Sequence, residues 1–145
     1  MLTEEPVLIE EFVRTGKVRI VFRDVLSHGE YSIRTHEAGA CAAQQGYFWD
    51  LHEILYRDQP EVSSTPEAGL AALMKKKAAA IAGLDSVAFG ACVDGRQMRE
   101  RVTTVDAEQR KRGISTQPIF EVAGQRLFGS RPIAAWRELL TMATR

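Results

Sequence analysis

Cysteine and histidine are the residue types here that most readily form a redox or metal site. The two cysteines, Cys41 and Cys92, lie far apart in the sequence, and neither belongs to a C-x-x-C pair. They therefore carry no local redox or zinc signature. The three histidines are also dispersed, and no cluster of carboxylates accompanies them. We expect no metal site and no cofactor.

Two states of the cysteines are compatible with the sequence. Free cysteine is among the most buried residue types, so Cys41 and Cys92 could be inert thiols on apolar helix faces. If the helices that carry them pack together, a disulfide closing about fifty residues would stabilise the fold by roughly 4 kcal/mol in the chain-entropy account. The sequence leaves both states open.

A proline stands at the front of an apolar, strand-like run in "TQPIF", residues 116–120. Proline cannot donate a ladder hydrogen bond, but it is tolerated at the first residue of a strand. A cis peptide bond between Gln117 and Pro118 would leave the preceding backbone turned outward and accessible to another chain. Gln117–Pro118 is therefore either a strand stop or a binding edge.

Composition limits the classes of protein and partner. The chain of 145 residues is 45% hydrophobic and 26% charged, which is a balance typical of one globular domain. Its formal net charge is zero, so no global field attracts nucleic acid. No apolar run is long enough to span a bilayer, and the acidic start "MLTEEPVLIEE" is unlike a secretory signal. We expect no nucleic-acid partner, no membrane insertion and no signal peptide in this chain.

Periodicity predicts mostly helices, one strand near the start and a hairpin near the end. The chain is predicted to begin with a helix over 4–14 that stops at Gly16 and a strand over 17–25. Residues 32–57 are predicted to be helical, with Gly46 either dividing the stretch into two helices or bending one helix. The later elements are a helix from Pro66 to Gly83 capped by Ser64 or Thr65, a short helix capped by Asp85, a charged helix over 96–112, a hairpin turning at Ala123–Gly124, and a closing helix from Ser130. This order predicts an α/β or α+β domain.

Five stretches in this order resemble the DsbA-like family of thiol-disulfide oxidoreductases over nearly the whole chain. They are "KVRIVFRDV", "EAGACAAQQGYFWDLHEILY", "FGACVDG", "GISTQPIFEVAGQRLFG" and "RPIAAWRELL". The resemblance implies an α/β thioredoxin-like fold with an inserted helical subdomain. Residues 1–31 would begin the thioredoxin domain, 32–113 would form the insertion, and 114–145 would complete the domain.

The resemblance also implies a site and a partner. It maps Pro118 onto the family's cis-proline and Gln117 onto the residue before it, which together hold an extended substrate segment. The implied partner is an extended polypeptide with cysteine thiols, and the implied compartment is extracytoplasmic, either the periplasm or the cell envelope.

The sequence departs from the family pattern at its beginning. The family's first strand and its C-x-x-C motif are missing, and neither Cys41 nor Cys92 stands at a helix start that would lower a thiol pKa. We therefore expect no catalytic residue and no disulfide exchange by this truncated chain. The alternative is a redox-inactive domain that binds peptides or acts as a scaffold. Glutathione-binding relatives are disfavoured because no serine stands in place of the missing cysteine.

Without the family's first strand, its two neighbours in the sheet would lack a hydrogen-bonding partner. In the thioredoxin sheet this first strand would lie between the strand at 17–25 and the strand at 118–122. Unpaired buried backbone groups cost about 1 to 3 kcal/mol each. We expect the 17–25 strand either to pair directly with 118–122 or to borrow a strand from a second copy in a homodimer, and we favour association.

Overall fold

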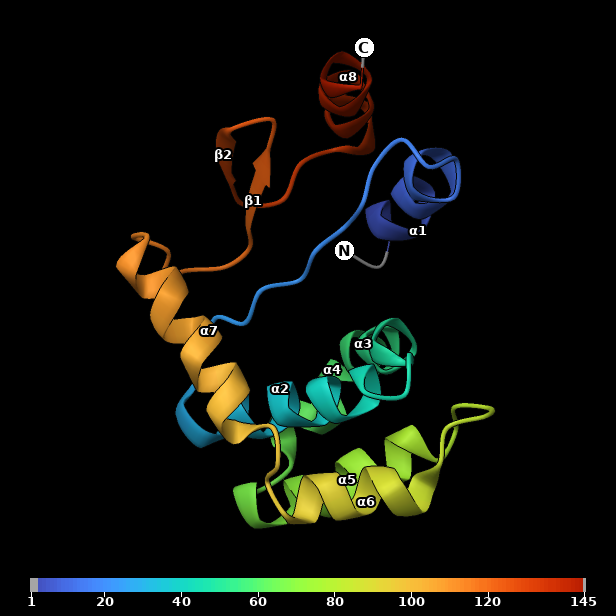
Figure 1. The fold of residues 1–145 in the computed structure, drawn as a ribbon, viewed down its shortest axis with the longest axis vertical. Helices are drawn as coiled ribbons and strands as arrows, with labels where there is room; N and C mark the ends of the chain where they lie inside the picture. The colour runs from blue at the N-terminus through green and yellow to red at the C-terminus, as the bar shows by residue number, and fades with distance from the viewer. Residues whose placement is uncertain (1–2, 145) are drawn as a thin grey trace. The chain divides into compact units, whose positions relative to one another are not determined.

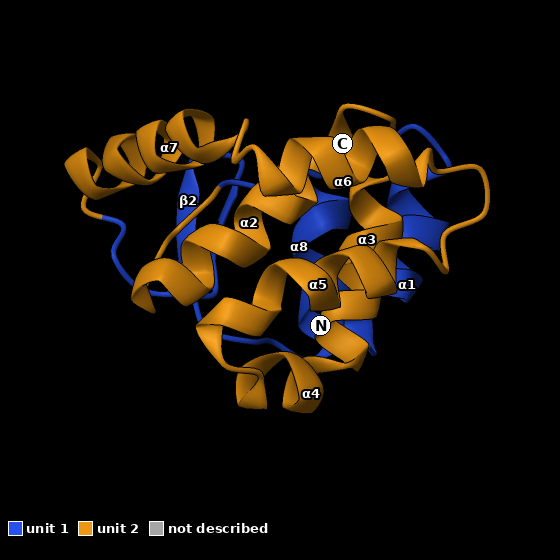
Figure 2. Cartoon of the chain, turned by 90° about the horizontal axis from the view of Figure 1, so that it is seen from below, with its two compact units in different colours: residues 1–23, 114–145 blue, residues 24–113 orange. Residues whose placement is uncertain are grey.

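The computed structural model describes residues 3–144 and divides into two compact units (Figure 2). Unit 1 comprises Met1–Arg23 and Ile114–Arg145, and unit 2 is the continuous stretch Asp24–Gly113. The secondary structure is a set of helices with one small antiparallel sheet (Figure 1).

Unit 1 is built from the two ends of the chain. Its elements are α1 (Glu4–Leu8), the π-helix η1 (Ile9–Val13), β1 (Ile119–Val122), β2 (Gln125–Phe128) and α8 (Ile133–Ala143). The predicted first helix is therefore present, with a change to π-helical hydrogen bonding in its second half. The chain leaves this helix at Gly16, whose φ of 74° suits a residue without a side chain.

Packing in unit 1 centres on α8. Trp136 of α8 is only 5% exposed, and its ring meets that of Phe120 from β1 edge-on, with 4.7 Å between the ring centroids. Such aromatic pairs add about 0.5–1.5 kcal/mol beyond the area they bury. On another side of α8, Arg137 donates hydrogen bonds to both carboxylate oxygens of Glu11, at 2.8 and 2.6 Å. The last helix thus holds both the hairpin and the first helix.

The hairpin turns where the sequence predicted. Val122 pairs with Gln125, which leaves Ala123 and Gly124 as the turn. Their φ values of 49° and 78° are the positive angles that a type I′ turn requires at both central residues. Phe120 lies opposite Leu127 in the antiparallel register, and Glu121 lies opposite Arg126.

The predicted strand over 17–25 is wrong. Residues 18–27 have no assigned secondary structure, and the sheet of the described residues contains β1 and β2 alone. The alternation that suggested a strand is nevertheless present, because Val18, Ile20 and Phe22 are half-buried while Arg19 and Val21 are exposed. A strand also needs a hydrogen-bonded neighbour, and β1 pairs with β2 instead. The expected direct pairing with 118–122 is likewise absent from the described residues.

Unit 2 consists of helices. They are α2 (Gly29–Ala43), α3 (Phe48–Arg57), α4 (Gln59–Ser64), α5 (Glu67–Ala78), α6 (Ser86–Asp94) and α7 (Arg99–Lys111). Gly46 separates α2 from α3, the first of the two predicted arrangements, with a φ of 85°. The predicted cap of α6 is also confirmed, since Asp85 Oδ1 accepts hydrogen bonds from the backbone N–H groups of Val87 and Ala88.

Two details around residue 65 differ from the prediction. Residues 59–64 form the short helix α4, which the sequence reading left as a break. The hydroxyl groups of Ser64 and Thr65 donate back to the carbonyl of Glu61, so neither caps α5. The residue before α5 is Pro66, whose side chain cannot accept a hydrogen bond, and α5 ends at Ala78 rather than near Gly83.

Small residues let the other helices approach α2. Ala38, Ala40 and Ala42 are each buried, and a Cβ built on Gly39 would lie 3.3 Å from Cε2 of Phe48. That separation is tighter than ordinary van der Waals contact. Helices α3, α5, α6 and α7 all contact α2, which makes it the centre of unit 2.

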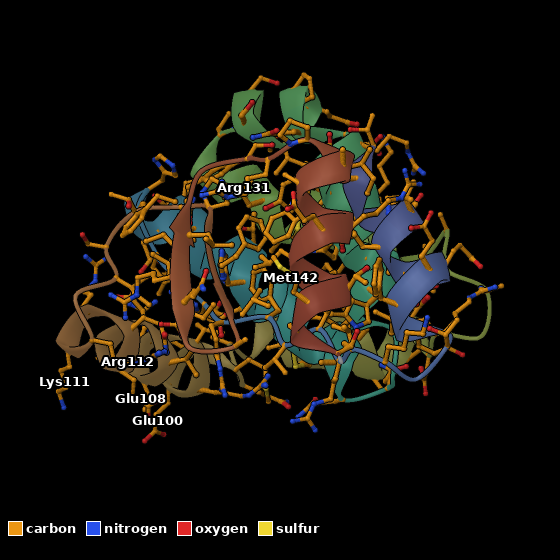
Figure 3. All side chains as sticks on the ribbon, turned by 90° about the horizontal axis from the view of Figure 1, so that it is seen from above. Glu100, Glu108, Lys111, Arg112, Arg131 and Met142 are labelled. Carbon is orange, nitrogen blue, oxygen red and sulfur yellow. A yellow bond between two sulfur atoms is a disulfide. The ribbon has the colours of Figure 1, made fainter. Side chains whose placement is uncertain are left out.

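Helix α7 is polar on most of its surface, and its hydrogen bonds include a group that reaches the start of unit 2. Exposed charged side chains such as Glu100, Glu108 and Lys111 line its outer face (Figure 3). Asp106 Oδ1 accepts a hydrogen bond from the Leu26 backbone N–H at 2.8 Å, and Arg110 donates to both Asp106 and the Leu26 carbonyl at 2.7 Å. This bonding ties the start of unit 2 to α7.

The Asp106 anchor predicts a pH-dependent contribution to stability. Burial alone would raise the Asp106 pKa, but the hydrogen bonds from Arg110 and Leu26 outweigh it and lower the pKa below its ordinary value of 3.8. A lowered pKa contributes stability that is complete above the ordinary value and is lost as pH falls through the folded value. We expect Asp106→Asn to lower the free energy of unfolding at pH 7 by about 1–2 kcal/mol. Urea denaturation of both proteins from pH 7 to pH 2.5 measures this.

The difference between wild type and Asp106→Asn should shrink as the pH falls below 4. A matched control is Glu108→Gln, which removes a carboxylate from the exposed face of the same helix and leaves the Asp106 hydrogen bonds in place, so it should change the free energy of unfolding at pH 7 much less than Asp106→Asn does. A constant gap between Asp106→Asn and wild type at all pH values would contradict the electrostatic origin of the effect.

Candidate functional site

The predicted binding residues, Gln117 and Pro118, lie at the surface of unit 1. Both are exposed, and the peptide bond between them is cis. They occupy the link between Ile114, which is buried, and the first residue of β1. The site is therefore a segment of main chain that leads into a strand.

The backbone of this segment is available for hydrogen bonding. Within the described part of the chain, the N–H and C=O groups of Thr116 and Gln117 take part in no hydrogen bond, and both residues are exposed. A main chain with unpaired donors and acceptors beside a strand is the surface that extended peptides use to add themselves to a sheet. The segment can thus bind another extended chain through main-chain hydrogen bonds.

The hairpin fixes the position of this segment. Gly129 N–H donates to the Pro118 carbonyl at 3.0 Å, which extends the ladder one pair beyond β1 and β2. Arg126 Nη2 donates to Glu121 Oε1 at 3.0 Å across the two strands. The ring contact between Phe120 and Trp136 then holds the hairpin against α8. Pro118 is therefore part of a rigid element, whereas Gln117 lies at its edge.

Thr116, Gln117 and Pro118 carry no charged side chain, and the charges of unit 1 lie on its other residues, such as the pair Glu11–Arg137. Hydrogen bonds from Arg137 lower the pKa of Glu11, so this carboxylate stays ionised through the neutral range. Neither Gln117 nor Pro118 carries a titratable or nucleophilic group. The segment can hold a peptide but cannot itself attack a disulfide.

The structure joins the two cysteines to each other. Cys41 on α2 and Cys92 on α6 form a disulfide whose Cα atoms are 6.0 Å apart, and the two side chains are 1% and 3% exposed. Of the two states that the sequence allowed, the structure shows the bonded one. The disulfide lies within unit 2, whereas Gln117 and Pro118 belong to unit 1.

Sequence reasoning missed a buried ion pair in unit 2. Glu37 is almost completely buried on α2, and its carboxylate accepts hydrogen bonds from Arg96 Nε at 3.2 Å and from Arg96 Nη2 at 3.0 Å. Arg96 also binds Glu30, at 2.7 Å, and has a φ of 51°. The only sequence signal was the Gly95–Arg96 break between two helices, and it did not indicate the partners.

The described residues offer no metal-binding cluster and no membrane-spanning helix. Among residues 3–144, no group of three or more His, Cys, Asp or Glu side chains is arranged to hold a metal ion. No helix in the described part of the chain is both long and apolar enough to cross a bilayer.

Comparison with protein families identifies the fold. The thioredoxin family profile matches residues 3–141, which is nearly the whole chain. The chain belongs to the thioredoxin family. The match extends across both units, and it confirms the predicted α/β thioredoxin-like fold class. No match to a curated protein was found.

The disulfide of this thioredoxin-family chain predicts a measurable contribution to stability. Because it closes a loop between residues 51 apart, its removal should lower the free energy of unfolding by about 4 kcal/mol in the chain-entropy account. Urea denaturation of wild type and of the Cys41→Ala/Cys92→Ala protein measures the difference. Thiol titration of the denatured wild type should detect no free thiol without reductant and both thiols after reduction.

A control separates the cross-link from the loss of side-chain packing. Reduced wild-type protein keeps both cysteine side chains, so it should lose nearly as much stability as the double alanine variant. If reduced and oxidised wild type unfold at the same urea concentration, the disulfide does not stabilise unit 2.

Proposed function

We propose that this protein works in protein disulfide exchange as a DsbA-like member of the thioredoxin family, and that the described residues hold its polypeptide substrate. The observation that carries the proposal is the exposed and unbonded backbone of Thr116 and Gln117 next to Pro118. The substrate would be an extended polypeptide that carries cysteine thiols. It would bind as an added strand segment.

Main-chain binding suits a substrate of varied sequence. Hydrogen bonds to N–H and C=O groups give affinity without requiring particular side chains. A client of disulfide exchange is unfolded or partly folded, and such a chain can adopt the extended form at the site. The side chain of Gln117 adds an amide that can donate and accept, so it can adapt to different neighbours.

The disulfide supports an extracytoplasmic location. Stable structural disulfides are common in oxidising compartments and rare in the cytosol, where thiols are kept reduced. Cys41–Cys92 is buried between helices, as expected of a structural cross-link rather than an exchanging one. We therefore propose the periplasm or the cell envelope as the compartment.

A second function is favoured by the same disulfide. Cys41 and Cys92 are the chain's two cysteines, and each is bonded to the other, so the thiolate that exchange requires is absent from these residues. On this observation the chain would act as a redox-inactive domain that binds peptides or serves as a scaffold. Both functions use the same peptide-binding segment and differ in redox chemistry.

Peptide binding can be tested by chemical-shift mapping. The probe is a synthetic unstructured peptide with one cysteine between valine and threonine residues, added to isotopically labelled protein. We expect the amide resonances of Gln117 and its neighbours to shift. Gln117→Pro removes one donor and should weaken binding up to about tenfold, as the net loss of one hydrogen bond predicts.

Two controls sharpen the test. Ser130→Pro removes another exposed N–H in unit 1 that has no hydrogen bond in the described residues, and it should leave binding unchanged. The same peptide with N-methylated residues, which cannot donate main-chain hydrogen bonds, should bind weakly. Shifts confined to residues of unit 2, or equal affinity for both peptides, would exclude this segment as the binding site.

An insulin-reduction assay tests whether the Cys41–Cys92 disulfide itself exchanges with a substrate. We expect this chain to leave the rate of insulin reduction by dithiothreitol at background, because its thiols are bonded together in the core. A rate above background that Cys41→Ala abolishes would show that the disulfide itself exchanges with substrate.

A further inference from the structure

A segment of unit 1 has the pattern of a strand, but among residues 3–144 no strand is paired with it. From Val18 to Phe22 the side chains alternate between half-buried and exposed, and Val21 is 52% exposed. The backbone groups of Arg19 and Val21 take part in no hydrogen bond within residues 3–144. The segment is drawn as a coil that follows η1 (Figure 1). An alternating, β-branched segment of this kind is suited to pairing with an open strand edge.

β1 presents such an edge. It pairs with β2 along one side, and its other side carries no strand in the described residues. Since the Pro118 carbonyl accepts from Gly129, the hydrogen-bonding groups of Ile119, one residue further, point away from β2. Phe120 is directed toward Trp136, so the side chains of Ile119 and Glu121 lie on the opposite face of the hairpin.

One antiparallel register makes the segment and this edge complementary. When Val21 lies opposite Ile119, Arg19 lies opposite Glu121, because antiparallel partners run in opposite directions. Residues directly opposite each other share a face of the sheet, so an apolar pair and a pair of opposite charges form on one face. On the other face, Ile20 falls beside Phe120, which extends the apolar surface against α8.

The charges in this register are compatible with the hairpin as it stands. Arg19 is exposed and makes no ion pair within the described part of the chain. Glu121 keeps its cross-strand bond to Arg126, and a carboxylate has enough acceptor capacity for a second cation. If the segment were shifted along β1 by one residue, Arg19 would lie on the same face as Phe120. The pairing of Val21 with Ile119 and that of Arg19 with Glu121 would then both be lost.

We propose that two copies of this chain form a two-fold dimer in which Val18–Phe22 of each copy pairs antiparallel with β1 of the other, with Arg19 opposite Glu121 of its partner. Each chain offers one segment and one edge, and the structure does not pair them within a chain. When two chains pair reciprocally, each segment and each β1 edge has a partner, so no further copy can be added and the assembly stops at a dimer. In this register Phe22 falls opposite Pro118, so the interface adjoins the peptide-binding segment at Gln117. Sedimentation measures association of the chain without added peptide, so the test of the dimer does not depend on the proposed function.

Charge exchange tests the register. Sedimentation equilibrium of wild type should show a reversible dimer, and Arg19→Glu should raise the dimer dissociation constant about tenfold, because it replaces an opposite-charge pair by a like-charge pair twice in the dimer. The variant Glu121→Lys/Arg126→Glu reverses the hairpin's own ion pair without removing it, and it should weaken the dimer to a similar extent. Combining all three substitutions should restore dimerisation.

Circular dichroism of each variant shows whether it remains folded. Three results would overturn the proposal: a wild-type chain that stays monomeric at every concentration, a dimer that Arg19→Glu leaves unchanged, or a triple variant no stronger than the single one. The second result would point to a different contact, such as pairing between two copies of β1.

Discussion

The close approach of helices to α2 is the constraint on which unit 2 depends. Ala38, Gly39, Ala40 and Ala42 present almost no side chain on this helix, so neighbouring backbones come near, and a methyl group at Gly39 would press on the ring of Phe48. The same short separation brings the Cα atoms of Cys41 and Cys92 to 6.0 Å, which lies within the range a disulfide needs. It also leaves Glu37 shielded from water, so that its charge requires the two hydrogen bonds from Arg96. The close helix packing, the Cys41–Cys92 disulfide and the Glu37–Arg96 ion pair thus all depend on the small side chains of α2.

Local signals in the sequence were sufficient where the structure depends on a few neighbouring residues. Asp85 caps α6 because a carboxylate before a helix can reach the free N–H groups of its own first turn. Gly46 ends a helix, and Ala123–Gly124 makes a hairpin turn, for similarly local reasons of backbone angle. These features could be predicted from one sequence, whereas the α/β thioredoxin-like fold class came from the family resemblance.

Features that depend on distant partners could not be derived in the same way. The alternation of Val18, Ile20 and Phe22 correctly indicates that one side of the segment is more buried, but it does not specify a neighbour with which to form a ladder. Cys41 and Cys92 carried no signal of pairing, because their contact is created by the packing of α2 on α6. For the candidate site, the sequence and a family resemblance indicated Gln117 and Pro118. The sequence could not show that the backbone groups of Thr116 and Gln117 make no hydrogen bond in the described residues, because this depends on where the hairpin ladder ends.

The division of the chain into a continuous unit and a discontinuous one has a consequence for its biosynthesis. All residues of unit 2 emerge from the ribosome in one stretch, so its helices have their packing partners before the last part of the chain has been translated. Unit 1 cannot do so, since the ion pair between Glu11 and Arg137 joins residues 126 positions apart. The first helix must therefore wait, its apolar face unprotected, until the final helix is released. Prior folding of unit 2 shortens the effective loop between the two ends, which lowers the entropy cost of bringing them together. The entropy argument thus implies that unit 1 folds more readily once unit 2 has folded.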